Sequence, residues 1–462
     1  MTDTPRACEA LVVGAGFAGL AAARALVRAG VDVVVVEARD RVGGRVFTET
    51  TASGARVDHG AQWIGPGQDT LQKLADELRL ETFPTFTTGD GVEWRDGRRA
   101  TYAGLVPTSD PAAAADGIEA IFELDLASRD VPLDAPWTAP GAGQLDQQTL
   151  GSWLARGVSS PGATSIITAA VKSIFGVEPS ELSLLFTLFY LHAGGGLMNL
   201  ARTTNGAQER RFVVGAQACA LALADELGER VRLSQPVTGI EWSGDGAVVT
   251  VAAGSGGDDE PERIRADRVI VAMAPALSVR LQWSPPLPGR RDQLSMRAPM
   301  GSVTKIHAVY DRPFWRDDGL NGQVVSDDGA LRVTFDDSPP DATHGVLLGF
   351  IAGSECRALD PLSPAERAAV AVRDLVRYFG PAAAHPLEVI EQHWPAEPFT
   401  RGGPVAVFGP GLLTDYGPSL REPVGPVHWA GTETATAWCG YMDGALSSGA
   451  RAAAEVAAAL GR

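Results

Sequence analysis

The segment Gly14–Gly19 has the spacing needed to bind the phosphates of a dinucleotide. It reads GAGFAG, a GxGxxG pattern that follows an apolar run and precedes an Ala- and Leu-rich stretch. In a strand–turn–helix unit, the first glycine permits the tight turn, the second lets backbone approach a pyrophosphate, and the third allows close helix–strand packing. The helix N-terminus would offer free N–H groups to the phosphates. A second apolar run ends at Glu37, whose carboxylate would accept hydrogen bonds from ribose hydroxyls.

A second glycine pair, Gly43 and Gly44, lies in the string EARDRVGGR that ends at Arg45. These glycines would let the backbone approach a ligand. Arg41 and Arg45 could meet phosphate charge. Together with the first glycine segment, the string predicts a bound dinucleotide rather than a glycine-rich turn without a ligand.

Lysine is scarce, because only Lys73, Lys172 and Lys305 are lysines among the 39 Lys and Arg residues. Lys73 and Lys172 fit helical stretches and need no other explanation. Lys305 lies in an alternating stretch, Ser302–Tyr310, where it shares one strand face with His307. A lysine there is either a surface residue with a buried stem or a buried functional amine, and spacing alone leaves both open.

The elements around these residues predict an α/β protein. Ala10–Val13, Leu20–Val27 and Val33–Val36 read as strand, helix and strand, and the last run is typical of a buried parallel strand. Further elements are expected as helices at Thr70–Leu80, across most of Leu150–Leu200, at Pro361–Phe379 and at Gly444–Leu460; as strands at Val231–Val251, Arg268–Met273 and Val427–Ala430; and as loops at Asp130–Asp146 and Gly254–Glu262.

Composition excludes several classes of protein. The 462 residues suffice for two to four domains at roughly 100–200 residues each. With 45% hydrophobic and 21% charged residues, the chain is globular rather than disordered. A net charge of −17 argues against a nucleic-acid partner.

Compartment and metal content follow from a few further features. The four cysteines form no CxxC or close pair, which fits a reducing cytosol, and the seven histidines are scattered, so no metal is expected. The N-terminus has no signal-peptide pattern. The longest apolar run, Leu182–Leu200, is interrupted by His192 and three glycines, and reads as a buried helix rather than a membrane span. We expect a cytoplasmic protein without a membrane partner.

The string EARDRVGGR and several longer strings later in the chain resemble the flavin-containing monoamine oxidases, a family of FAD-dependent amine oxidoreductases. The first string favours FAD over NAD. The others are DHGAQWIGP at 58–66, TTNGAQER at 203–210, Pro236-Val237, GSVTK at 301–305, PFW at 313–315, GTETAT at 431–436 and GYMDG at 440–444.

The resemblance implies a Rossmann-like FAD-binding domain with an inserted substrate-binding domain of mixed sheet and helices. The FAD-binding domain would be discontinuous, comprising residues 1–82, 213–293 and 397–462. The substrate-binding domain would comprise residues 83–212 and 294–396. Whether the chain forms a homodimer is left open.

The resemblance also implies roles for individual residues. Lys305 would hold a water against flavin N5, which a compact amine can do and a planar guanidinium cannot, and burial would lower its pKa. Tyr441 would take one of two ring positions that align the amine. Substrate-pocket residues are Gln208, Trp63, Phe350 and Tyr441. FAD-binding residues are Gly14, Gly16, Phe17, Ala18, Gly19, Glu37, Ala38, Arg39, Gly43, Gly44, Arg45, Gln62, Trp63, Val237, Trp394, Gly431, Thr432, Glu433, Tyr441 and Met442.

The chain departs from the monoamine oxidases at two neighbouring positions. Gly403 stands where they carry the cysteine that links FAD covalently, and Pro404 stands where they carry the second ring. Non-covalent FAD and a half-open aromatic cage are therefore expected.

The implied reaction is hydride transfer from the carbon beside an uncharged amine to flavin N5. It gives an imine, then a carbonyl, and O₂ is reduced to hydrogen peroxide. An L-amino-acid oxidase of the same fold is a competing interpretation, weakened because residues 58–66 contain no arginine to clamp a carboxylate. A tailoring dehydrogenase or N-demethylase stays open because the cage is half open. A non-catalytic flavin-binding partner protein is the alternative of another class, and the retained Lys305 argues against it.

Overall fold

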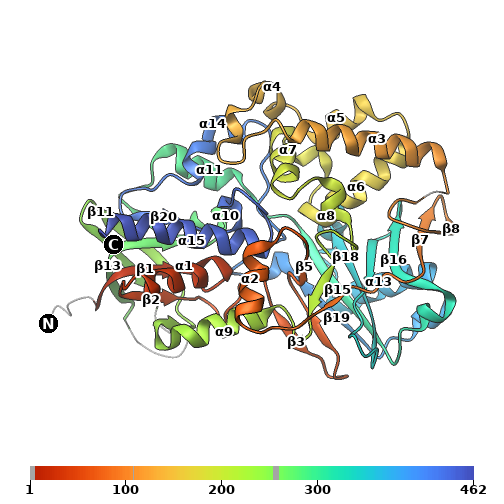
Figure 1. Cartoon of the computed structure of the whole chain (residues 1–462), viewed down its shortest axis with the longest axis horizontal. Helices are drawn as coiled ribbons and strands as arrows, with labels where there is room; N and C mark the ends of the chain where they lie inside the picture. The colour runs from red at the N-terminus through yellow and green to blue at the C-terminus, as the bar shows by residue number, and fades with distance from the viewer. Residues whose placement is uncertain (1–5, 108, 253–259) are drawn as a thin grey trace.

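Two large β-sheets organise the protein, and helices cover them (Figure 1). The computed structural model describes residues 6–107, 109–252 and 260–462. Most of the loop expected at 254–262 lies outside these residues.

The first sheet is built on parallel strands. β1 (Arg6–Val13) pairs with β2 (Val33–Val36) on one side and with β13 (Glu262–Val271) on the other, and β20 (Val427–Trp429) also pairs with β13. All four residues of β2 are buried, as a parallel strand covered on both faces requires. The sheet continues through β10 (Val231–Arg232) beyond β2, and through β12 (Gly246–Val251), β11 (Val237–Ser243) and β14 (Gln282–Ser284) beyond β13.

The predicted strands of this sheet are confirmed, but β1 and β13 begin earlier than predicted, β1 at Arg6 and not at Ala10. β13 begins at Glu262, well before the apolar run at Arg268. Its first half pairs antiparallel with β12, whereas its second half lies between β1 and β20. A strand whose neighbours change along its length carries no single burial pattern, so the apolar run marked only its fully buried end.

Two helices from opposite ends of the chain lie side by side on this sheet. α1 (Phe17–Arg28) is drawn red and α15 (Met442–Ala459) blue in Figure 1. Their apolar faces join one core with the sheet and with α9 (Gln217–Leu227). Gly449 makes the close approach possible, since a Cβ there would stand 2.1 Å from the Ala18 carbonyl oxygen. This packing fixes the N-terminus of α1.

The second sheet holds the strand that carries Lys305. Its order is β19 (Glu388–His393), β15 (Val303–Tyr310), β18 (Gly345–Ala352), β17 (Leu331–Asp336), β16 (Leu320–Ser326), β7 (Asp90–Arg95) and β8 (Arg98–Tyr102).

Every residue of β15 is buried, because the strand is covered on both faces. Ile306 and Ala308 pack in a core with α13 (Pro364–Phe379). Since side chains alternate along a strand, Lys305 and His307 point to the opposite face. Burial therefore excludes the surface interpretation of Lys305, and its role as a functional amine stays a prediction.

Helices form a separate group above the second sheet (Figure 1). The expectation of a mainly helical Leu150–Leu200 is confirmed by α5 (Leu150–Gly157), α6 (Pro161–Phe175), α7 (Leu184–Ala193) and α8 (Leu197–Ala201). They pack with α3 (Pro111–Ser128) around α7, which is buried nearly all round. No helix in the described part of the chain is long and apolar enough to cross a membrane.

The prediction that Asp130–Asp146 is a surface loop is wrong in part. The segment contains a short 3₁₀ turn, Pro136–Thr138, and helix α4 (Ala142–Asp146). Asp146 is fully buried and accepts hydrogen bonds from Ser183 and Thr414. The Pro and Gly content predicted a loop, whereas these distant contacts fold the segment into the core.

The expectation that Lys172 needs no explanation beyond its place in a helix is also incomplete. Its side chain lies on α6 but is 4% exposed, and Nζ pairs with Glu178 at 2.8 Å and with Glu355. Two of the three lysines are thus buried and partnered. The ion pairs join α6 to the start of α12 (Ser354–Leu359), just after β18.

The proposed domain boundaries divide the strands of the two large sheets cleanly. The first sheet draws its strands from 6–36, 231–284 and 427–429, and the second from 90–102 and 303–393. We therefore keep the discontinuous two-domain division as a proposal.

Gly449→Ala should destabilise the protein by about 1–3 kcal/mol, because the new methyl group would collide with α1 backbone. Gly143→Ala in α4 is the matched control, since a Cβ there meets no atom within 4 Å. It should be neutral or stabilising by up to about 1 kcal/mol. Urea unfolding of both variants measures this, and equal midpoints would contradict the packing argument.

Candidate active site

A cavity of about 550 Å³ is lined by residues from both sheets. One end lies against the carboxyl ends of β1 and β2, beside Glu37. The other end lies against β15, beside Lys305. Its walls combine backbone from the glycine segments with aromatic side chains from the second sheet and the helices.

The start of α1 faces the cavity without a capping side chain. Gly16 is the N-cap residue, and no side chain caps the first turn. Gly16 forms an isolated parallel bridge with Gly43, so the two glycine segments lie against each other. The first-turn N–H groups of the helix are thus available to an anion in the cavity.

Two glycines hold this arrangement because no side chain fits. A Cβ on Gly19 would stand 1.9 Å from the Gly14 carbonyl oxygen, so α1 packs directly on the preceding turn. Gly43 has φ +105°, and a Cβ there would stand 2.4 Å from the Val46 carbonyl oxygen. Both contacts explain the spacing of the glycines in the sequence.

Glu37 ends β2 at the cavity and is 4% exposed. Its two carboxylate oxygens accept the backbone N–H of Ala15 at 2.7 Å and of Arg39 at 3.0 Å. Each oxygen keeps lone-pair capacity for a hydroxyl donor. The carboxylate is therefore held in a fixed position in which it could also bind ribose.

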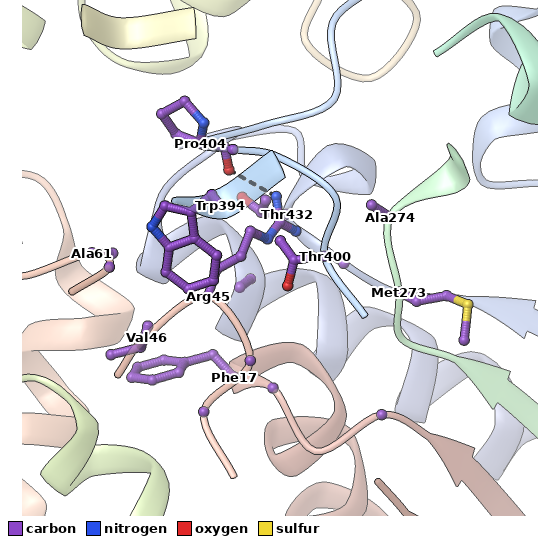
Figure 2. A pocket seen from close by; sticks show the side chains of 18 of the residues that line it. Phe17, Arg45, Val46, Ala61, Met273, Ala274, Trp394, Thr400, Pro404 and Thr432 are labelled. Carbon is purple, nitrogen blue, oxygen red and sulfur yellow. Dashed lines mark hydrogen bonds between the residues drawn. The ribbon is translucent and has the colours of Figure 1, made fainter. Parts of the chain in front are cut away.

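Arg45 is tied to the C-terminal glycine signature. Its guanidinium donates to both carboxylate oxygens of Glu433, at 2.6 and 3.1 Å. It also donates to the Pro404 carbonyl at 2.8 Å (Figure 2). Burial opposes ionisation of Glu433, but the Arg45 charge outweighs it and lowers the pKa of that carboxyl. Arg45 thus links three stretches of chain around the cavity.

Lys305 is 2% exposed and donates three hydrogen bonds to one segment of chain. Nζ donates to the carbonyl oxygens of Asp58 at 2.5 Å and Gly60 at 2.9 Å, and to Gln62 Oε1. Gln62 Nε2 in turn donates to Asp337 Oδ1 at 2.6 Å. These bonds fix the amine at the end of the cavity.

Burial lowers the pKa of Lys305 to about 8, although the carboxylates of Asp337 and Asp58 act in the opposite direction. Burial also raises the pKa of Asp58 to about 6. An amine that titrates near neutrality can take up and release a proton under ordinary conditions.

Aromatic side chains enclose the same end of the cavity. Trp63, Phe335 and Phe350 form one cluster, with the Trp63–Phe335 centroids 5.1 Å apart. Tyr441 packs edge-on against Trp438 at 5.2 Å and lies 6.3 Å from the Tyr190 ring. The walls here are apolar and rigid.

Gln208 adds a polar group to this apolar end. Its Nε2 donates to the Leu200 carbonyl at 2.6 Å, while the buried Oε1 has no partner among the residues described. Because buried polar atoms are normally paired, this oxygen is a ready acceptor for an N–H in the cavity.

The structure brings nearly all the predicted site residues together. All of the predicted FAD-binding, catalytic and substrate-pocket residues line the cavity except two. Gly19 instead packs beneath the glycine turn, and Glu433 holds Arg45 from behind.

Several lining residues escaped the sequence prediction. Tyr190 lies on the uniformly apolar α7, where no periodicity singles it out. Phe335 precedes the Asp336-Asp337 pair on a strand that was not predicted. Thr400 accepts a 2.5 Å hydrogen bond from Arg39, across 361 residues of sequence. Short sequence motifs indicate none of these residues, since each is brought to the cavity by contacts with residues far along the chain.

The residues present fit FAD. The cavity joins a carboxylate for ribose, an uncapped helix start for phosphate, and a buried amine with aromatic walls for a ring system. Residues 6–107, 109–252 and 260–462 contain no cluster of side chains able to hold a metal ion.

Comparison with known proteins extends this fit to the whole chain. Residues 17–457 match the family described as flavin-containing amine oxidoreductases. A Mycobacterium tuberculosis protein named as a flavin-containing monoamine oxidase, AofH, is 42% identical over 100% of this chain and 99% of its own. Flavin-containing amine oxidase B of Sus scrofa is 36% identical over 98% of this chain and 87% of its own.

Solved structures agree. A putrescine oxidase bound to putrescine superposes with a TM-score of 0.93 at 33% identity, covering 98% of this chain and 100% of that one. Cyclohexylamine oxidase from Brevibacterium oxydans superposes with a TM-score of 0.92 at 34% identity, with the same coverage. The likeness therefore covers both sequence and fold over nearly the whole chain.

The low pKa of Lys305 can be measured directly because the chain has only three lysines. With carbon-13 at lysine Cε, NMR should show three signals, of which the one lost in Lys305→Met titrates at a pH of about 8. Asp337→Asn should lower this pKa further, because it removes a negative charge that favours the ammonium. A Lys305 signal that titrates near the ordinary value of 10.5 would contradict the burial argument.

Proposed function

The chain belongs to the family of flavin-containing amine oxidoreductases, and on this premise we propose that it oxidises apolar primary monoamines. The family establishes FAD-dependent oxidation of small-molecule amines with O₂. The substrate class depends on the walls of the cavity at its Lys305 end.

The observation that carries this proposal is the distribution of charge along the cavity. Among the residues described, Glu37 is the only carboxylate that lines it, and Glu37 lies at the end opposite Lys305. A diamine bound with its reacting carbon near Lys305 would bury its second ammonium between aromatic rings. An unpaired buried ammonium costs several kcal/mol, so the cavity favours a substrate with one amino group.

The same argument disfavours an α-amino acid. The arginines that line the cavity are Arg39, Arg45 and Arg280. Arg45 is paired with Glu433, and Arg39 lies beside Glu37. Arg280 lines the cavity together with Met273 and Leu277, which come from a segment outside β15. A substrate carboxylate near Lys305 would therefore lack a free guanidinium.

Bound FAD would accept a hydride from the carbon beside the amine nitrogen and would pass the electrons to O₂. We assign the remaining tasks to this chain. Trp63, Phe335 and Phe350 exclude water and hold the apolar part of the amine. Tyr441 orients the amine, and Gln208 Oε1 accepts one of its N–H groups. Lys305 holds a water and exchanges a proton with it.

A set of amines of equal length tests the substrate class. Hexylamine should be oxidised with kcat/KM about tenfold or more above hexane-1,6-diamine and 6-aminohexanoate, since each of these adds one unpartnered charge. N-methylhexylamine tests the secondary-amine alternative in the same series. Hydrogen peroxide release and anaerobic bleaching of the flavin band both measure the reaction. Equal rates with the diamine would contradict the proposal, whereas bleaching by none of the amines would contradict amine oxidation itself.

Non-covalent binding of FAD is a second proposal, which rests on Gly403. The residue lines the cavity, and an added Cβ would meet only Val303 Cγ1 at 3.6 Å and Trp394 Cγ at 4.0 Å. The space for a cysteine therefore exists, but the thiol does not.

Denaturation should release all FAD from the natural protein, because residue 403 is a glycine and offers no thiol to bond it. Gly403→Cys should retain yellow colour on the acid precipitate, and Gly403→Ser, which fills the same space without a thiol, should not. Absorbance of pellet and supernatant measures the partition. Colour retained on the precipitate of the natural protein would show that FAD is bound covalently.

A further inference from the structure

A second group of titratable side chains lies directly behind Lys305. His307 shares its strand face, two residues along β15, and is fully buried. His59 lies between Asp58 and Gly60, the two residues whose carbonyls accept hydrogen bonds from Lys305. The two imidazole rings face each other edge-on with centroids 6.1 Å apart.

Three of the four ring nitrogens lack a hydrogen-bond partner among the residues described. They are both nitrogens of His307 and Nδ1 of His59. The closest charged partner of His307 is Asp337, whose Oδ2 lies 3.6 Å from Nε2, beyond a good hydrogen bond. Buried polar atoms of this kind are met by water, which makes about three hydrogen bonds at such a site.

The fourth ring nitrogen contacts a side chain that reaches the surface. His59 Nε2 lies 2.7 Å from Glu49 Oε2, and the Glu49 side chain is 50% exposed whereas that of His59 is 3% exposed. Phe47 stacks on the His59 ring at 4.9 Å and keeps it in place. His307 thus lies two residues from Lys305 on one strand face and beside the His59 ring, and His59 contacts the half-exposed Glu49.

Burial and the surrounding charges keep both imidazoles neutral, so each ring has one nitrogen with a free lone pair. Burial is the main cause that lowers the pKa of His307 and of His59, and the Lys305 charge acts in the same direction on both. Arg211 also lowers the pKa of His307, and Arg41 lowers that of His59. Glu49 acts on His59 in the opposite direction, and the Asp337 carboxylate faces His307.

We propose that His307 and His59, bridged by water, carry protons between Lys305 and the solvent at Glu49. This inference rests on the proposed proton exchange of Lys305 with the site. An amine arrives as RCH₂NH₃⁺ and must lose one proton to give the uncharged RCH₂NH₂ that is oxidised. The neutral Lys305 takes that proton through its water, and the imidazoles pass it outward.

The route returns a proton in the second half of the cycle. Reduction of O₂ to H₂O₂ consumes two electrons and two protons, and the hydride taken from the amine supplies both electrons and one proton. The other proton comes from solvent through the same groups. The sum is RCH₂NH₃⁺ + O₂ → RCH=NH₂⁺ + H₂O₂, in which atoms and charge balance.

Hydrogen exchange at Lys305 Nζ tests the route without turnover. With nitrogen-15 lysine and FAD bound, the Lys305 ammonium should be observed at a pH of about 6, below its titration. His307→Leu and His59→Phe should each slow its exchange with water about tenfold or more, because the relay is interrupted. His307→Gln should also slow exchange while keeping a polar side chain, and it decides the matter if the leucine variant does not fold.

His428→Leu is the matched control. His428 is a buried histidine whose Nδ1 lies 3.0 Å from Glu455 Oε2, but it lies on β20 and does not line the cavity. In the His428→Leu variant, the Lys305 ammonium should exchange hydrogen with water at the same rate as in the natural protein. Unchanged exchange in folded His307 and His59 variants, or equal slowing in the His428 variant, would overturn the proposal.

Anaerobic flavin reduction supplies a readout tied to chemistry. The His307 and His59 variants should be slowed about tenfold near pH 7, and should approach the natural rate as the pH rises and the amine enters uncharged. A pH-independent loss would mean a structural role only, and would overturn the relay. An absence of flavin reduction in the natural protein, with exchange at Lys305 intact, would instead contradict the proposed function.

Discussion

The three hydrogen bonds from Lys305 to the Asp58–Gln62 segment join the two halves of the site. Lys305 belongs to the second sheet, whereas the accepting segment follows β4 (Arg56–Asp58) and leads to Trp63. Every residue of β15 is buried, so the Lys305 amine cannot reach solvent and takes its partners from the protein. A buried ammonium must be satisfied, and its three N–H groups match the three uncharged acceptor oxygens of this segment.

This one constraint connects packing with chemistry. The same burial that demands partners for Lys305 lowers its pKa to about 8. A surface lysine with the same hydrogen bonds would stay charged, and an arginine would not titrate at all. The Arg45–Glu433 ion pair follows the contrary rule, because the Arg45 charge keeps the Glu433 carboxylate ionised and the pair supports the FAD-binding loops.

The sequence predicted those parts of the site whose physical requirement is local. GxGxxG and Glu37 lie within one strand–turn–helix–strand unit, so spacing alone determines their arrangement. Lys305 was harder, because alternation assigns a residue to a face but does not tell which face is covered. Lys172 and Tyr190 were misjudged or missed because partners far along the chain bury them. Asp146 was placed in a loop for the same reason.

Gly403 and Pro404 are the two positions at which the chain departs from the monoamine oxidases. Both residues line the cavity, and Pro404 also accepts a hydrogen bond from Arg45 through its carbonyl. The backbone of residue 404 therefore contacts Arg45 although its side chain carries no aromatic ring. Trp63, Phe335 and Phe350 make the Lys305 end of the cavity a poor place for any second charge. A low-dielectric wall that depresses the pKa of a lysine also favours the uncharged form of a bound amine, so one physical property prepares both partners of the reaction.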